Sequence, residues 1–317
     1  MTKSEFYNIV EINDIQVSIP HSSHFTIGTS PYYAHQHALG IDIYHSLHLD
    51  NYEVLSPISG EILKVKTLLA PKAKFLGGID RDCLILVGNL HNPDITYKIL
   101  HVKPNNIHVG ERIEIGDPIG MTFRNGYFAN WSSPHIHLEI RPSNDAIRAS
   151  GGKTFSLAFK KRKSKIYKEE RKSAEISLKI DSAFPEFFLG SFPEGFYKKI
   201  DPIYGLKVMV NQKDCILDGG VPHYKNGTII SDHGFSLEVQ NSIYLGNQRI
   251  GKLLKSRGQF GFFKFDPFLK FFLNGEEIRG ISLYLANFKP LIKIIPYMDN
   301  KITLNAKSTQ QLTIIST

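Results

Sequence analysis

Cysteine is scarce in this chain of 317 residues, which contains only Cys83 and Cys215. Two thiols so far apart in the sequence form no disulfide framework, so we expect free or buried thiols in a reducing compartment. No uninterrupted apolar run approaches the ~20 residues of a membrane span. The first residues, MTKSEFYNIVEIND, are partly acidic and lack the apolar stretch of a secretory signal peptide. These absences predict a soluble, cytoplasmic protein without a transmembrane segment, and leaderless export is the alternative.

Sustained helical periodicity is also missing. The 25 glycines and 16 prolines separate many short apolar runs, a pattern typical of strands joined by turns. Two segments, VLSPISGEILKVK and ERIEIGDPIGMTF, each place a turn with Pro and Gly beside alternating apolar residues. This weak repeat indicates two similar β-halves folded together. We therefore predict an all-β chain.

Positive charge is concentrated in one segment. The net charge is +8, and residues 153–172 carry nine Lys or Arg against two Glu, an excess close to the whole surplus. A solvated connector is the usual role of such a run, and contact with an anionic partner is the alternative. Nucleic-acid binding is disfavoured, because no aromatic binding motif accompanies the run. We predict a first β domain over 1–145 with lead-in strands over 1–30, a basic linker over 146–174, and a C-terminal β domain over 175–317.

Residues 175–317 again show turn signals between apolar stretches. DGG, KNG, LGN and NGEE each separate two such stretches. Asn226-Gly227 and Asn274-Gly275 are dipeptides typical of two-residue hairpin turns. The second domain is therefore predicted to be a β-sandwich or a small barrel.

Histidine is concentrated in the first half, where 11 of the 13 histidines precede residue 138. The clearest fragment is PHIHLEI, residues 134–140. On a strand, His135, His137 and Glu139 would share one face, with the two histidine Cα atoms about 7 Å apart. Such a pair can hold a metal and reach its bound water. The alternative is a pair of surface or hydrogen-bonded histidines.

Two further fragments supply candidate ligands. AHQHALGIDIY, residues 34–44, contains His35, His37 and Asp42, which are side chains suited to zinc. Gly40 would let the backbone turn so that His37 and Asp42 converge. In TYKILHV, His101 ends an apolar strand, where a structural histidine is the common case. Asp42 could equally cap a turn.

Together these fragments resemble the lysostaphin-type zinc endopeptidases, whose catalytic domain is a duplicated β-hybrid motif. In that family a His and an Asp of an H-x-x-x-D motif and the second His of H-x-H bind zinc. GIDI, SPISGEI, His101-Val, GERIEIGDPIG and PHIHLEI occur here in the family's order. The resemblance covers residues 33–141.

Carried over, the resemblance implies that His37, Asp42 and His137 bind Zn²⁺. His37 departs from the motif, because it lies five residues before Asp42 rather than four. His35 is the less favoured substitute for His37. The resemblance also implies that His101 and His135 act in catalysis, and the sequence leaves open which of them is the base. The predicted activity is a zinc-dependent metalloendopeptidase acting on a peptide or peptidoglycan-like substrate.

Two other functions remain as alternatives. The first is a non-catalytic zinc- or peptide-binding module with a partner-binding C-terminal domain. A structural site would need neither His101 nor His135, which disfavours it. The second is a carrier or phosphocarrier module, whose two β-halves look similar. A carrier needs a modifiable Lys at a hairpin tip, which is absent here, and a phosphocarrier would not use Asp42.

Overall fold

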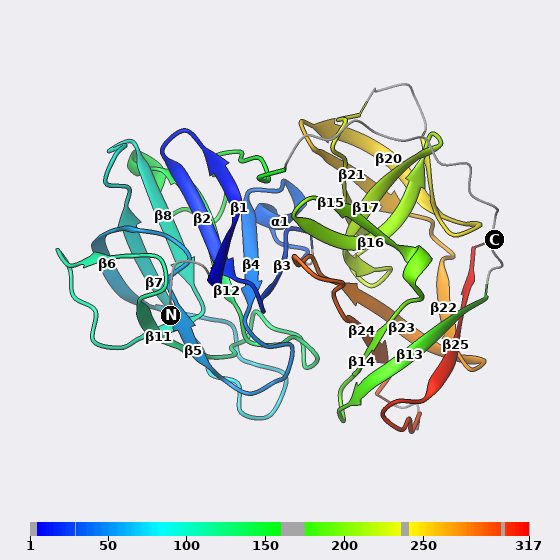
Figure 1. Ribbon diagram of the computed structural model, residues 1–317. Coiled ribbons are helices and arrows are strands. Elements are labelled where there is room, and N and C mark those ends of the chain that lie inside the picture. The colour runs from blue at the N-terminus through cyan, green and yellow to red at the C-terminus, as the bar shows by residue number, and fades with distance from the viewer. Residues whose placement is uncertain (1–4, 29, 160–174, 236–240, 299–301, 317) are drawn as a thin grey trace. The chain divides into compact units, whose positions relative to one another are not determined.

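The computed structural model describes residues 5–28, 30–159, 175–235, 241–298 and 302–316 (Figure 1). Within these residues the regular structure is almost entirely β, which confirms the predicted fold class. The helical segments are α1 (Tyr33–Gln36) and two 3₁₀ turns, η2 (Ser143–Asp145) and η3 (Glu194–Phe196). None of these helices has the length to cross a bilayer. The chain divides into two compact units, Met1–Ile27 with Tyr32–Ala158, and Gly28–Pro31 with Phe159–Thr317.

The first unit is built on a seven-stranded antiparallel sheet in the order β10-β6-β7-β8-β12-β4-β3. Its strands are β10 (Arg112–Ile113), β6 (Gly60–Leu69), β7 (Arg81–Gly88), β8 (Ile95–Leu100), β12 (Ile136–Pro142), β4 (Gly40–Tyr44) and β3 (His24–Thr26). Residues 136–141 of β12 are all buried. Both faces of β12 are therefore covered, so the face that carries His137 is not a solvent surface.

The two similar segments of the sequence lie side by side. A three-stranded sheet joins β5 (Glu53–Leu55), β11 (Pro118–Thr122) and β9 (Val102–Pro104), while β10 pairs with β6. Each half thus exchanges strands with the other. Their turns also meet, since Ser56 N–H donates to Asp117 O and Gly116 N–H donates to Ser56 O at 2.8 and 2.9 Å. This reciprocal pairing is what two similar β-halves folded together would give.

The lead-in residues form a hairpin of β1 (Phe6–Ile12) and β2 (Ile15–Pro20). At the other end of the unit, Leu157 bridges to Val10 and Ala158 N–H donates to Ile9 O at 3.0 Å. Residues 157 and 158 of the predicted basic linker thus pack against β1. Most of the basic run, residues 160–172, lies outside the described residues.

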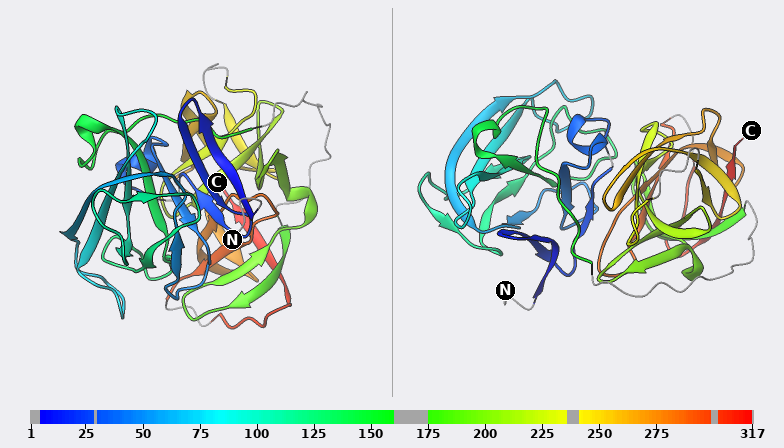
Figure 2. Two further views of the ribbon diagram at one scale, coloured as in Figure 1. Left: turned by 60° about the vertical axis from the view of Figure 1, so that its left-hand side comes forward. Right: turned by 90° about the horizontal axis from the view of Figure 1, so that it is seen from above.

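The second unit consists of strands that close into two rings, and the curled sheets are visible in Figure 2. One ring runs β16-β19-β20-β21-β18-β17 and closes through the pairing of β16 with β17, and β15 adds to its β16 edge. The other runs β23-β22-β25-β13-β14-β24 and closes through β23 with β24. The first ring comprises β15 (Tyr197–Ile200), β16 (Ile203–Val210), β17 (Lys213–Val221), β18 (Asn226–Ile230), β19 (Ser242–Leu245), β20 (Gln248–Arg257) and β21 (Phe260–Phe265). The second comprises β13 (Glu175–Ala183), β14 (Phe188–Ser191), β22 (Lys270–Leu273), β23 (Glu276–Leu283), β24 (Ile292–Pro296) and β25 (Thr309–Ile315).

Of the two hairpin turns predicted for this unit, one is confirmed and the other is wrong. Asn274-Gly275 forms the two-residue turn between β22 and β23, with φ of 51° and 85°. The prediction for Asn226-Gly227 is wrong, because both residues pair with β21 inside β18. The turn lies earlier, at Lys225, which has φ 62°. Sequence alone could not show that the Pro222–Lys225 segment already reverses the chain.

Candidate metal centre

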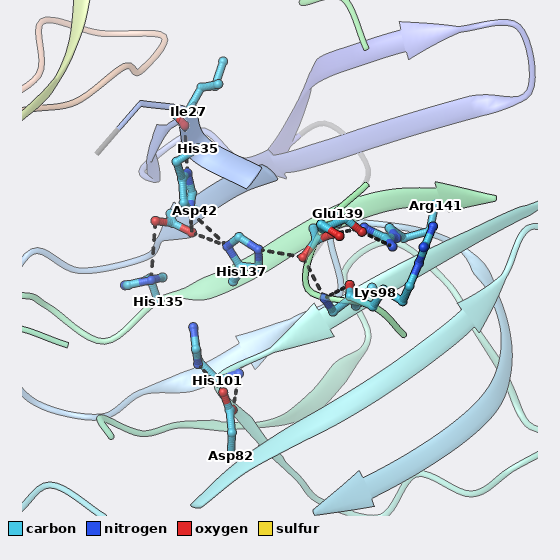
Figure 3. A network of polar contacts seen from close by, with 12 residues as sticks. Ile27, His35, Asp42, Asp82, Lys98, His101, His135, His137, Glu139 and Arg141 are labelled. Atoms are coloured by element: carbon cyan, nitrogen blue, oxygen red, sulfur yellow. Dashed lines mark hydrogen bonds and ion pairs between the residues drawn. The ribbon is translucent and has the colours of Figure 1, made fainter. Parts of the chain in front are cut away.

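Asp42 and His137 meet because their strands are neighbours. In the antiparallel pair of β4 and β12, Asp42 lies directly opposite His137. Opposite residues project from the same face of a sheet. Oδ1 of Asp42 lies 2.8 Å from Nδ1 of His137, and both side chains are buried (Figure 3).

His35 reaches the same point from the single helical turn α1. Its Nδ1 lies 2.7 Å from the Ile27 carbonyl oxygen. A carbonyl only accepts, so Nδ1 carries the proton and Nε2 presents a lone pair. That Nε2 lies 3.3 Å from Asp42 Oδ1 and 3.2 Å from His137 Nδ1. Ligand atoms of His35, Asp42 and His137 thus gather within 4.8 Å of one another, and all three residues are buried.

The spacing of these donors fits a tetrahedral zinc site. Nitrogen and oxygen ligands lie 2.0–2.2 Å from zinc, so adjacent ligand atoms of a tetrahedron are about 3.3 Å apart. The three distances found here are 2.8, 3.2 and 3.3 Å. The backbone also leaves room for the rings, since a Cβ on Gly40 would lie 2.8 Å from Cε1 of His137. Two imidazoles and one carboxylate are the donor set of a zinc site with an open position.

The structure places the predicted ligand His37 elsewhere. Its ring stacks on Tyr33 with centroids 4.2 Å apart, and its Nδ1 lies 2.9 Å from Tyr33 O. Within the described residues the metal-capable group contains His35 in its place. The reason is local, because α1 ends at Gln36 and the chain then turns through Ala38 at φ 48°. The geometry therefore favours the substitute His35 as the third ligand.

The two predicted catalytic histidines flank the group. His135 precedes β12, and its Nδ1–H donates to Ser133 O at 2.9 Å, which leaves Nε2 3.5 Å from Asp42 Oδ2. The His101 ring lies 5.4 Å from that of His135 and 6.0 Å from that of His137 between centroids. Phe128 packs against the rings of both His101 and His135. The three candidate ligands and these two histidines thus form one buried cluster.

His101 is held by Asp82, a residue that no motif of the sequence indicates. His101 follows β8 in a left-handed conformation, with φ 68°. Its N–H donates to Asp82 Oδ1 at 2.9 Å, and its Nδ1 lies 2.9 Å from Asp82 Oδ2. The other ring nitrogen therefore points away from Asp82, toward the cluster (Figure 3). No local sequence signal connects the start of β7 with the end of β8.

Burial and the carboxylates set the charges of the site. Burial alone would raise the pKa of Asp42, but His35, His135 and His137 outweigh it and hold the pKa well below the usual range. Burial lowers the pKa of His135 to about 4, partly offset by Asp42. For His137 burial is outweighed by hydrogen bonds to Asp42 and Glu139, which raise its pKa to about 9. The pKa of Asp82 is lowered by His101 against the effect of burial.

Comparison with family models gives matches over both units. Residues 15–157 match a model described as the N-terminal domain of a domain of unknown function, DUF8155. Residues 199–307 match the model of the DUF8155 C-terminal domain. The chain thus matches the models of both DUF8155 domains, one in each unit. A search of curated proteins found no match.

Several solved structures are similar to this chain at low TM-scores. The antimicrobial peptidase lysostaphin from Staphylococcus simulans has a TM-score of 0.28 and 16% identity, covering 76% of this chain and 93% of that chain. A zinc-containing peptidase from Vibrio cholerae has a TM-score of 0.24 and 17% identity. The match covers 48% of this chain and 36% of the peptidase chain. A chain of a SpoIIQ–SpoIIIAH pore-forming complex has a TM-score of 0.25 and 14% identity. The match covers 39% of this chain and 80% of that chain. Scores this low do not by themselves establish a shared fold or a shared activity.

Proposed function

We propose that the first unit binds one Zn²⁺ through His35, Asp42 and His137 and hydrolyses peptide bonds. The observation that carries the proposal is the buried group of these three residues, with Nε2 of His135 beside it, 3.5 Å from Asp42 Oδ2. Three protein ligands and an open fourth position are typical of catalytic zinc sites rather than structural ones. A zinc ion held there would supply a water of lowered pKa and a Lewis acid for the scissile carbonyl.

The histidines that are not ligands give this site its catalytic character. His135 has its proton fixed on Nδ1 by the Ser133 carbonyl, so its Nε2 can accept a hydrogen bond or a proton. His101 has Nδ1 beside the Asp82 carboxylate, an arrangement that orients an imidazole and stabilises its protonated form. We therefore assign proton acceptance to His101, with His135 as the second polar group facing the substrate. A site that only held zinc would need neither.

Peptide or peptidoglycan-like substrates are the class to test first, since the motifs of the chain resemble those of lysostaphin-type endopeptidases. The full-length, zinc-loaded protein should cleave members of a panel of cross-linked and linear peptides. Because a bound zinc ion would lower the pKa of the attacking water, removal of metal with 1,10-phenanthroline should abolish cleavage, and zinc but not magnesium should restore it. The readout is product release by mass spectrometry.

A preparation of His137→Ala purified in parallel controls for contaminating peptidases. Cleavage that persists after complete metal removal, or that is equal in His137→Ala, would contradict the proposal. So would a zinc-loaded protein that leaves the whole panel intact.

A further inference from the structure

Glu139 sits on the far side of His137 from the candidate zinc ligands. It follows His137 by two residues on β12, so both side chains project from the same face. Its Oε1 lies 3.2 Å from His137 Nε2. The carboxylate is almost completely buried, with 3% of its side chain exposed. His137 is thus placed between two acids, Asp42 at Nδ1 and Glu139 at Nε2 (Figure 3).

Two buried cations fix the carboxylate of Glu139. Lys98 lies directly opposite Glu139 on β8, and its Nζ donates to Oε1 at 2.8 Å. Arg141 Nη1 donates to Oε2 at 2.9 Å. Lys98 is 5% exposed and Arg141 is fully buried. With a cation on each oxygen, the Glu139 carboxylate cannot rotate away from His137.

The cations are themselves held by backbone. The Arg141 guanidinium donates to the carbonyl oxygens of Asp145 at 2.7 and 2.9 Å and of Ser150 at 3.0 Å. Lys98 Nζ also donates to Arg148 O at 3.3 Å. Burying three charged side chains costs desolvation, and such networks are weak contributors to stability. Their best use is to fix one arrangement of side chains, which here is the ring of His137.

We propose that Glu139 is the positioning residue of the zinc site, a role that rests on the proposed function. By accepting from Nε2–H of His137 it fixes the tautomer whose Nδ1 lone pair faces Asp42 and His35. Metal-binding histidines generally donate their second N–H to a carboxylate or carbonyl, which sets the ring orientation and makes the ligand more basic. The ring lies against Gly40, where an added Cβ would come within 2.8 Å of His137 Cε1, so a larger residue there would displace it.

Replacement of Glu139 by glutamine is the informative change. The carboxylate serves Lys98 and His137 with one oxygen and Arg141 with the other. An amide has only one oxygen, so its NH₂ must face either Arg141 or His137. If the NH₂ faces Arg141, two donor groups point at each other and no hydrogen bond forms. Facing His137, the NH₂ moves the ring proton to Nδ1, the atom that zinc requires.

The test is a zinc titration of the metal-free, full-length protein in competition with a chromophoric chelator. Glu139→Gln should bind zinc about 10–100-fold more weakly than wild type, the range typical of such outer partners. Lys98→Met, which removes one anchor, should weaken binding less than Glu139→Gln does. Glu53→Gln and Lys66→Met are the matched controls on residues outside the network, and their affinity should be unchanged. In the zinc-saturated wild type, ¹⁵N–¹H spectra should show a slowly exchanging His137 Nε2–H that exchanges faster in Glu139→Gln.

The outcomes separate this inference from the proposed function. If wild type binds zinc and Glu139→Gln binds it within twofold, the positioning role is overturned while the zinc site stands. A Glu139→Gln protein that melts at a lower temperature with unchanged zinc affinity makes the network purely structural, which also overturns the proposal. Wild type that binds no zinc overturns the zinc site, and the role of Glu139 with it.

Discussion

His35→Ala is expected to lose zinc, whereas His37→Ala is expected to keep it. Nε2 of His35 lies 3.2 Å from Nδ1 of His137 and 3.3 Å from Oδ1 of Asp42, while His37 stacks on Tyr33. Four-ligand zinc sites bind with about 10–16 kcal/mol, so one ligand is worth about 3 kcal/mol, or about a hundredfold in affinity. Zinc affinity of the two purified variants, measured by chelator competition, checks this.

His37→Ala serves as the matched control, because both changes remove an imidazole from the same short stretch of chain. Circular dichroism at equal protein concentration should show that both variants keep the β fold. Loss of zinc in His37→Ala with retention in His35→Ala would restore His37 as the ligand and contradict the geometry described above.

Alanine at His101 or His135 is expected to abolish most peptide hydrolysis while zinc stays bound. Neither side chain belongs to the three-residue metal group, yet the rings lie 5.4 Å apart beside it. A positioned general base or acid contributes about 10²–10⁴-fold to rate. Initial cleavage rates of zinc-saturated variants, on whichever peptide wild type cleaves, measure the loss.

The exposed His108 on the same unit supplies the control, and His108→Ala should cleave at the wild-type rate. If His135→Ala releases zinc, then His135 is a ligand rather than a catalytic group, and its 3.5 Å approach to Asp42 Oδ2 would be the reason. Unchanged cleavage in both His101→Ala and His135→Ala would favour a non-catalytic zinc module.

The fold and half of the site follow from periodicity. Alternation in PHIHLEI places His137 and Glu139 on one strand face, as the structure has them. The Pro-Gly turns predict two β-halves, and their turns meet at Ser56 and Asp117. Strand alternation is a local property, so it can be predicted from a single sequence. The pairing of β4 with β12, which brings Asp42 to His137, is not encoded in the alternation of either strand.

What the sequence could not supply depends on irregular backbone and distant pairing. The choice between His35 and His37 is made by where one helical turn ends. Asp82 meets His101 only because β7 and β8 are neighbours, although the two residues are 19 positions apart in the chain. Lys98 meets Glu139 because the register of β8 and β12 places the two residues opposite each other. None of these contacts leaves a motif, because each is fixed by tertiary structure rather than by spacing.

Zinc stoichiometry is the most direct test of the proposed metal centre. Elemental analysis of the purified full-length protein, with Asp42→Ala and His137→Ala prepared alongside, counts the ions per chain. We predict about one zinc per chain in wild type, because the ligand spacing matches one tetrahedral site, and none in either variant. Wild type without zinc even after incubation with the metal, or zinc retained in both variants, would show that these residues do not form a zinc site.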